Sequence, residues 1–277
     1  MTSWDPQVYG RYAAERARPF VDLLARVAAE RPRRVVDLGC GTGELTASLA
    51  RRWPDAQVLG LDSAPSMLAK ATEHVEHAEH AAQNQATGRL RFELGDAAHW
   101  SPPQPVDVLV TNALLQWMPG HLDLLPRWVE ALAPGGWIAL QVPGNFDAPS
   151  HALMREVAAL PRFADRLDGV LRGNESVGDP MDYAAVLADA GCTVDAWETT
   201  YLHVLDPAGQ HGDDAVLAWV QGTGLRPVTD ALADDPALRQ DFVDTYAARL
   251  RSAYPRRRWG TPLPFRRVFA VAHRAAR

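Results

Sequence analysis

One stretch near the start of the chain constrains the fold more than any other. Residues 35–38 (Val-Val-Asp-Leu) favour a strand and run directly into glycines at three alternate positions, Gly39, Gly41 and Gly43. An amphipathic segment at 45–53 follows them. This order is typical of a buried parallel strand that turns sharply into a helix. Because glycine has no Cβ, the backbone of such a turn can approach a bound molecule closely. We therefore expect a ligand at the carboxyl end of this strand.

The spacing of the glycines indicates the kind of ligand. A dinucleotide-binding turn has the pattern G-x-G-x-x-G and faces a pyrophosphate with its helix N-terminus. Here the third glycine comes one residue earlier, and Asp37 stands two residues before the first glycine. An acidic side chain at the turn would repel a pyrophosphate but suits a cationic ligand. The pattern therefore disfavours an NAD-dependent oxidoreductase.

Two further carboxylates follow predicted strands. The strand predicted at 57–61 ends at Asp62, a position from which a carboxylate accepts hydrogen bonds from ribose hydroxyls. The apolar stretch 90–94 is followed by Gly95, Asp96 and Ala97. Three strand ends that bring carboxylates to one crevice fit a cationic nucleoside. The alternative is a glycine turn among unrelated surface carboxylates.

This combination resembles the class I S-adenosylmethionine-dependent methyltransferases. The resemblance implies a Rossmann-like α/β fold with a seven-stranded sheet, and S-adenosyl-L-methionine as the cofactor. It implies that Asp37 lies near the methionine amine, that Asp62 holds the ribose, and that Asp96 and Ala97 meet the adenine. The predicted cofactor-binding residues are Asp37, Gly39, Gly41, Gly43, Asp62, Ser63, Met67, Asp96, Ala97 and Asn112.

Length and composition limit the organisation and the partners. A chain of 277 residues, 47% of them apolar, can form one domain with insertions around a full core. The net charge of −6 gives no overall basic field for nucleic acid or an anionic membrane. Cys40 and Cys192 are the two cysteines, too few for a disulfide framework or a four-cysteine zinc site. With no signal peptide or spanning run in the sequence, we expect a soluble cytoplasmic monomer or homodimer.

The order of predicted elements divides this single methyltransferase domain into parts. Residues 1–33 form an N-terminal segment that either covers the crevice as a lid or stays solvated. After the second strand, Ser63 is the expected N-cap of a helix with Pro65 in its first turn. The other parts are the cofactor-binding core at 34–146, helical cap insertions at 147–190 and 213–254, and the last strands at 191–205 and 263–274.

The stretch 73–88 is rich in histidine, glutamate and glutamine. His74, His77 and His80 stand three residues apart, which raises metal binding as an alternative to a solvated helix. Glutamates alternate with the histidines and no cysteine accompanies them, so we favour the solvated helix and predict no metal site.

The loop after the fourth predicted strand, 106–110, carries Gln116 and Trp117. In class I methyltransferases this loop faces the transferable methyl group, so the resemblance makes these two residues the catalytic candidates. Together they offer an amide, an indole N–H donor and a flat apolar wall. Core packing is the alternative role for Trp117.

A closer resemblance extends over nearly the whole chain. The runs that carry it are similar to the trans-aconitate 2-methyltransferase family, which implies monomethyl esterification of trans-aconitate. They include Trp4-Asp5-Pro6, Asn112-Ala113-Leu114-Leu115-Gln116-Trp117, His151-Ala152-Leu153-Met154-Arg155, Trp197-Glu198-Thr199-Thr200-Tyr201 and Thr223-Gly224-Leu225-Arg226-Pro227.

The implied chemistry makes modest demands on the protein. A carboxylate with a pKa near 4 is already ionised at neutral pH, so its methylation needs no general base. Transfer from a sulfonium to a carboxylate cancels a positive and a negative charge, and excluding water favours such a transition state. The protein must hold oxygen, methyl and sulfur in line. A helical cap over the crevice would serve this purpose.

A tricarboxylate also needs cationic partners, and arginine binds carboxylates with two parallel hydrogen bonds. Taken singly, each candidate arginine is also compatible with an ordinary surface charge. The predicted substrate-binding residues are Tyr12, Arg16, Trp117, Arg155, Tyr201 and Arg226, with Arg266, Arg267 and His203 as further candidates.

Two other functions remain open at this point. One is methylation of a different carboxylate, or of an oxygen, nitrogen or carbon of another small molecule. The other is a protein that binds S-adenosylmethionine without catalysis. Substrate preference distinguishes the first from our interpretation, and absence of turnover despite tight cofactor binding would indicate the second.

Overall fold

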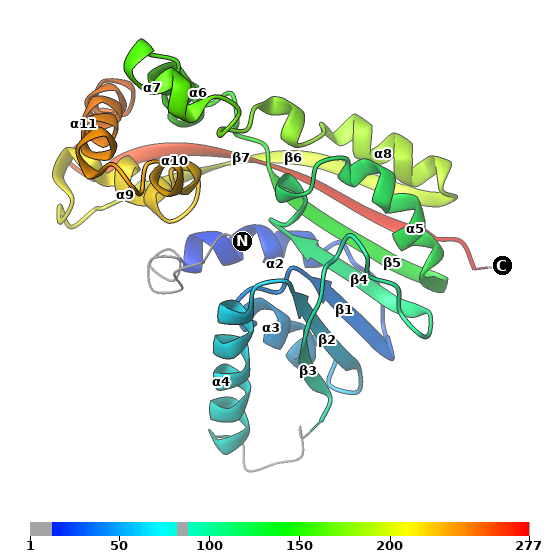
Figure 1. Cartoon of the computed structure of the whole chain (residues 1–277). Coiled ribbons are helices and arrows are strands. Elements are labelled where there is room, and N and C mark those ends of the chain that lie inside the picture. The colour runs from blue at the N-terminus through cyan, green and yellow to red at the C-terminus, as the bar shows by residue number, and fades with distance from the viewer. Residues whose placement is uncertain (1–12, 82–87, 277) are drawn as a thin grey trace.

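The computed structural model describes residues 13–81 and 88–276. In these parts of the chain one seven-stranded sheet has the order β3-β2-β1-β4-β5-β7-β6 (Figure 1). β1 to β5 are parallel, and β7 runs antiparallel to both of its neighbours. The predicted Rossmann-like α/β fold is confirmed. The strands are β1 Arg34–Leu38, β2 Gln57–Asp62, β3 Leu90–Leu94, β4 Val106–Asn112, β5 Leu132–Pro143, β6 Cys192–Leu205 and β7 Thr261–Arg274.

Helices cover both faces of the sheet. α2 (Ala13–Leu24) and α3 (Glu44–Arg52) pack on one face, with α4 (Pro65–Ala81) beside α3, whereas α5 (Leu125–Glu130) and α8 (Pro180–Asp189) cover the other. Alternate residues of the central strands point to opposite faces, so Val35 belongs to the α2 and α3 side and Val36 to the α5 and α8 side. Burial on both faces explains the continuous apolar runs in the sequence.

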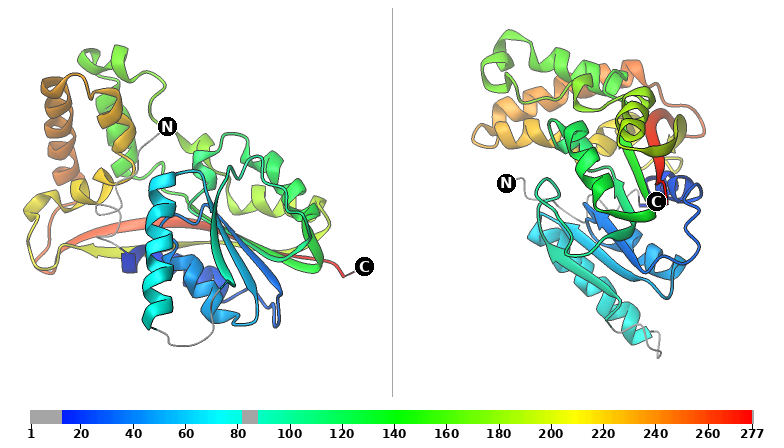
Figure 2. Two further views of the ribbon diagram at one scale, coloured as in Figure 1. Left: turned by 60° about the horizontal axis from the view of Figure 1, so that its bottom comes forward. Right: turned by 90° about the vertical axis from the view of Figure 1, so that its right-hand side faces the viewer.

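A separate group of helices forms a cap where the parallel strands end (Figures 1 and 2). Its apolar core joins these helices to the ends of β6 and β7 and includes Phe163, Phe242 and Tyr246, all fully buried. The predicted cap insertion at 147–190 therefore has two parts. Its first helices belong to the cap, whereas its last helix, α8, packs on the sheet. The cap helices are α6 Pro149–Ala158, α7 Pro161–Leu167, α9 Ala215–Gln221, α10 Arg226–Ala231 and α11 Pro236–Ala253, and short 3-10 turns are η1 Leu115–Trp117, η2 His121–Leu124, η3 Asn174–Ser176 and η4 Gly212–Asp214.

The start of α4 differs from the expected one. The helix begins at Pro65, so Ala64 and not Ser63 precedes it. Oδ1 of Asp62 accepts a hydrogen bond from the Ala64 amide at 2.9 Å, which makes the aspartate that ends β2 the side chain that orders this turn. Among the residues that the structure describes, no helix is long and apolar enough to cross a membrane.

The cap core makes a test of stability. Phe163 is fully buried and packs edge-on against Phe242, with ring centroids 5.2 Å apart. Phe163→Ala should lower the free energy of unfolding by about 3 to 5 kcal/mol, because it removes apolar contacts and leaves a cavity. Urea denaturation measures the change. Val21→Ala, at a side chain that is 62% exposed, is the control and should change it by less than about 0.5 kcal/mol. A loss below about 1 kcal/mol for Phe163→Ala would mean that the cap has no tightly packed core.

Candidate active site

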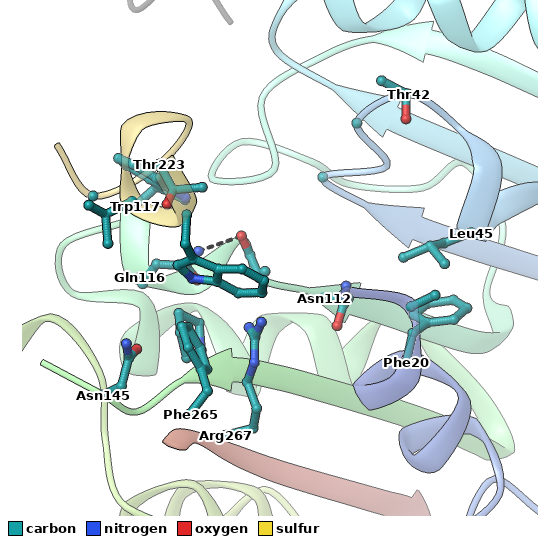
Figure 3. A pocket seen from close by; sticks show the side chains of 18 of the residues that line it. Phe20, Thr42, Leu45, Asn112, Gln116, Trp117, Asn145, Thr223, Phe265 and Arg267 are labelled. Atoms are coloured by element: carbon teal, nitrogen blue, oxygen red, sulfur yellow. Dashed lines mark hydrogen bonds between the residues drawn. The ribbon is translucent and has the colours of Figure 1, made fainter. Parts of the chain in front are cut away.

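A pocket of about 370 Å³ lies at the carboxyl ends of β1, β4 and β5, under the cap (Figure 3). The glycine loop after β1 forms one wall, and η1 after β4 forms a second. α9 with the following residues Thr223 and Gly224 closes it from the cap side, and β7 contributes Phe265 and Arg267. Helix α2 adds Ala17 and Phe20. The pocket thus joins the cofactor loop predicted from the sequence to residues of the cap.

The three loop glycines have different roles. All have positive φ angles, +77° at Gly39, +56° at Gly41 and +78° at Gly43. A Cβ on Gly39 would lie 2.9 Å from Leu114, and one on Gly43 would lie 2.6 Å from Phe92. A Cβ on Gly41 would meet no atom of the described residues within 4 Å. Gly41 is therefore where a ligand can approach the backbone, and the other two glycines let the loop pack.

Asp62 fixes the shape of this loop. Its Oδ2 accepts a hydrogen bond from the Gly41 amide at 2.9 Å, which ties the end of β2 to the turn after β1. Asp96 is exposed and accepts hydrogen bonds from the Ala98 amide and from His99 Nδ1, both at 2.8 Å, and these bonds lower its pKa. Neither aspartate lines the pocket.

The predicted cofactor set is thus only partly gathered around the pocket. Asp37, Gly39, Gly41 and Asn112 line it. The roles predicted for Asp62, Asp96 and the other members stay predictions. Those other members are Gly43, packed as described, Ser63, exposed, and Met67 and Ala97, both buried.

Asp37 is the buried acid of the site. Its side chain is 2% exposed, and its Oδ2 accepts a hydrogen bond from Thr46 Oγ1 at 2.6 Å. Burial raises the pKa of Asp37 to about 7, with a further contribution from the charge of Asp62 and an opposing one from the Thr46 hydrogen bond. A cation bound beside it would favour the ionised form and so lower this pKa.

The η1 turn presents Gln116 and Trp117 to the pocket, as Figure 3 shows. Gln116 Nε2 donates to the Ala113 carbonyl at 2.6 Å, while its buried Oε1 has no hydrogen-bond partner among the described residues. One of the two amide N–H groups is therefore used, and Oε1 remains as an acceptor for the site. The predicted catalytic roles of Gln116 and Trp117 stay predictions.

Two arginines line the pocket, Arg172 half-buried and Arg267 buried. Arg172, in the loop after α7, donates to the Gln116 carbonyl at 2.7 Å, and its guanidinium carbon lies 3.6 Å from the centre of the Trp117 ring. Burial lowers the pKa of Arg172 to about 10, so the guanidinium remains charged at neutral pH. Arg267, on β7, is 6% exposed and lies over the Phe265 ring at 4.4 Å.

The arginines favoured from the sequence lie elsewhere. Arg155 is 3.9 Å from Asp147, and Arg226 is 3.6 Å from Asp230. Neither lines this pocket. Tyr201 is also outside the wall, where its hydroxyl donates to Asp22 at 2.6 Å. Their predicted contacts with substrate stay predictions. Of the remaining candidates, Arg266 is bound to Glu198 and Asp179, while Tyr12 and the Arg16 side chain lie outside what the structure describes.

His151 is a pocket residue that sequence reasoning missed. Its Nδ1 lies 3.4 Å from Asn145 Nδ2 and 3.2 Å from Ser150 Oγ. Both neighbours can donate to Nδ1, which leaves the proton on Nε2. Burial lowers the pKa of His151 to about 4, helped by the charges of Arg155 and Arg172. The ring is therefore neutral at physiological pH and acts as an N–H donor.

Comparison with known proteins identifies the family. A model described as a methyltransferase domain matches residues 35–136. The chain is 56% identical to the trans-aconitate 2-methyltransferase of Streptomyces coelicolor, over 98% of this chain and 87% of that protein. The protein of the same name from Streptomyces avermitilis is 52% identical, over 99% and 98%. The chain belongs to the trans-aconitate 2-methyltransferase family. The predicted family and enzyme class are confirmed.

Solved structures agree on the fold of this family member. A putative sarcosine dimethylglycine methyltransferase from Galdieria sulphuraria superposes with a TM-score of 0.55, covering 99% of this chain and 92% of that one. Its sequence identity is 14%, so this similarity shows the fold alone.

The pKa of Asp37 generates a prediction for ligand binding. A ligand that places an ammonium group beside Asp37 binds the ionised carboxylate, so below about pH 7 a proton must first be released. The affinity for S-adenosylhomocysteine should therefore fall by about tenfold for each pH unit below that pKa. Calorimetric titrations of the wild type at several pH values measure it.

Asp37→Asn is the matched variant, because it keeps the size of the side chain and removes its titration. It should bind more weakly at pH 7.5 and show little change with pH. A wild-type affinity that stays constant between pH 5.5 and 7.5 would contradict a protonated Asp37 next to the ligand.

Proposed function

We propose that this protein transfers a methyl group from S-adenosyl-L-methionine to one carboxylate of trans-aconitate and forms a monomethyl ester. The names of its relatives support this substrate. The observation that carries the proposal is a single pocket that connects Asp37 and Gly41 with two arginines, Arg172 and Arg267. The first pair suits a cationic nucleoside and the second a polyanion.

The residues at the loop end fit the methionine part of the cofactor. Gly41 leaves open space beside its backbone, and Asp37 provides an acid whose ionisation a cation would promote. Asn112 lines the same wall, with a buried Oδ1 that accepts no hydrogen bond from the described residues. An ammonium group would satisfy both acceptors. When bound, S-adenosyl-L-methionine supplies an electrophilic methyl group on a sulfonium.

The acceptor end of the pocket positions an anion and limits its contact with water. The reacting carboxylate is already ionised and needs no base, and His151, with a pKa of about 4, is a neutral donor to it. Phe146, Phe265 and Trp219 add apolar surface around this end. Low water content favours a transition state in which opposite charges cancel. Alignment of the reacting atoms is then the main contribution of the protein.

The remaining parts of the proposal concern the cover of the active site, the partners of the protein and its oligomeric state. The cap and α2 cover the crevice during transfer, a role supported by the contributions of Phe20, Trp219 and Thr223 to the pocket wall. The lid role predicted for the N-terminal segment includes residues 1–12, which lie outside the described residues. The protein acts on a small polycarboxylate and not on nucleic acid or a membrane, in the cytoplasm, as a monomer or homodimer. The net charge of −6 disfavours nucleic acid, and it makes binding of a small anionic substrate depend on the local positive charge of the two arginines.

The test is transfer of a labelled methyl group from S-adenosylmethionine to trans-aconitate. We expect labelled product that releases methanol in mild base, as an ester does. Gly41→Ala should lose both transfer and S-adenosylhomocysteine binding, since the new Cβ occupies the ligand's approach at a φ of +56°. Gly191→Ala is the matched control, because Gly191 also has a positive φ and open surroundings but lies outside the pocket wall.

Two outcomes would contradict the proposal. Label on another small molecule but not on trans-aconitate would change the substrate. Tight binding of S-adenosylhomocysteine without transfer to any di- or tricarboxylate would indicate a protein that binds the cofactor without catalysis.

A further inference from the structure

We propose that Arg172 and Arg267 each hold a different non-reacting carboxylate, so that the protein selects tricarboxylates and methylates the one carboxylate that no arginine holds. This inference rests on the proposed function and assigns specificity within the same site. Neither arginine belongs to the cofactor loop, and they come from different elements, the loop after α7 and strand β7.

Arg172 is held in place before any substrate arrives. One of its nitrogens donates to the backbone carbonyl of Gln116 at 2.7 Å, and the guanidinium stacks on Trp117 at 3.6 Å. A guanidinium has five N–H donors, so a bidentate face remains for a carboxylate. Stacking on an aromatic ring fixes the plane of that face at little entropic cost. Arg172 is therefore preorganised beside the Trp117 wall.

Arg267 occupies a different position in the pocket. In Figure 3 its side chain rises from β7 toward the space next to Trp117, between Phe265 and Asn112. The side chain lies over the Phe265 ring at 4.4 Å, and the residue is 6% exposed. A charge in so dry a place gains much from an anionic ligand, because water screens the attraction poorly there. The sheet register explains this placement, because Arg267 of β7 pairs with Pro143, the last residue of β5.

Among the described residues that line the pocket, Arg172 and Arg267 are the two arginines, and the remaining cation, Lys70, lies on α4 together with the pocket residue Glu73. Gln116 offers a buried acceptor, Oε1, which repels an anion, and Asn112 offers another, Oδ1. His151 is a neutral donor and gives a single hydrogen bond. Hydrogen bonds to arginine occupy the lone pairs of a carboxylate and reduce its nucleophilicity. The carboxylate without an arginine keeps its reactive lone pair.

The step balances without a proton transfer. The free carboxylate oxygen forms the new O–C bond as the S–C bond breaks, and the electron pair of that bond stays on sulfur. One negative and one positive charge are cancelled, which yields a neutral ester and a neutral thioether. The product keeps two anchored carboxylates. A second methylation would require the neutral ester to replace one of them at an arginine, so the reaction stops at the monoester.

Three dicarboxylates test this arrangement, because each lacks one carboxylate of trans-aconitate. They are itaconate, mesaconate and (Z)-glutaconate, assayed with wild type, Arg172→Gln and Arg267→Gln. On trans-aconitate we expect each variant to lose about 100-fold in kcat/KM, mostly through a higher KM. The reason is that removing one partner of a buried charge pair leaves the carboxylate without its counter-charge and weakens binding. The wild type should lose a similar factor on two of the dicarboxylates and give no ester with the third, which lacks the reacting group.

The decisive comparison is the coupling between protein and substrate deletions. For each variant, one dicarboxylate lacks the carboxylate that the substituted arginine would hold. On that dicarboxylate the kcat/KM of the variant should be less than about fivefold below that of wild type. This dicarboxylate should be a different one for Arg172→Gln than for Arg267→Gln. The proposal would be overturned if, for every dicarboxylate, the loss in kcat/KM from the substitution multiplied the loss from the missing carboxylate. It would also be overturned if both variants were insensitive to the same missing carboxylate. No product from wild type and trans-aconitate would instead refute the proposed function.

Control variants separate anchoring from folding. Arg251→Gln removes an arginine of the cap helix α11 that binds Asp214 at the surface at 2.8 Å, and it should leave kcat/KM unchanged. Arg172→Lys keeps the charge and should recover part of the loss on trans-aconitate. Both pocket variants should bind S-adenosylhomocysteine within about threefold of wild type, since neither arginine is assigned to the cofactor. Arg172→Lys could regain kcat/KM on trans-aconitate without regaining the wild-type preference for trans-aconitate over the dicarboxylates. That result would mean that Arg172 supports Trp117 and does not hold substrate.

Discussion

The hydrogen bond from the Gly41 amide to Asp62 determines the geometry on which the site depends. It joins the end of β2 to the turn after β1, and the second oxygen of the same carboxylate orders the start of α4. Gly39 and Gly43 allow this loop to pack against Leu114 and Phe92. The loop therefore presents Gly41 to the pocket in one conformation, and Asp37 lies beneath it with its charge suppressed by burial. A cationic ligand relieves that suppression.

The second determinant is the length of the last two strands. β6 and β7 each have 14 residues, whereas β1 has five. The register between β5 and β7 ends at Pro143 and Arg267, and beyond this point β7 pairs with β6 alone. This extension carries Phe265 into the cap core and leaves Arg267 at the border between sheet and cap. A shorter hairpin would bring neither the cap nor this arginine to the cofactor loop.

Much of this could be predicted from the sequence. The strands follow from buried apolar runs and alternation, and the glycine turn after β1 follows from the spacing of its glycines, because both are local patterns. The start of α4 was misplaced by one residue, since Asp62 and not Ser63 provides the ordering hydrogen bond. Arg172 has no local signal at all. It lies in an irregular loop, and only packing against Trp117 places it in the pocket. Arg155 and Arg226 were predicted because they lie in the helical insertions expected to cap the site, but the face of a cap helix that meets the pocket depends on how the cap helices pack.

The most direct test of this account is a crystal structure of the protein with S-adenosylhomocysteine and trans-aconitate. We expect the amine of the thioether ligand beside Asp37, and one guanidinium, Arg172 or Arg267, within about 2.7 to 3.2 Å of each of two carboxylates. The third carboxylate should face the sulfur next to Trp117. A tricarboxylate bound outside this pocket, or held through Arg155 and Arg226 instead, would contradict it.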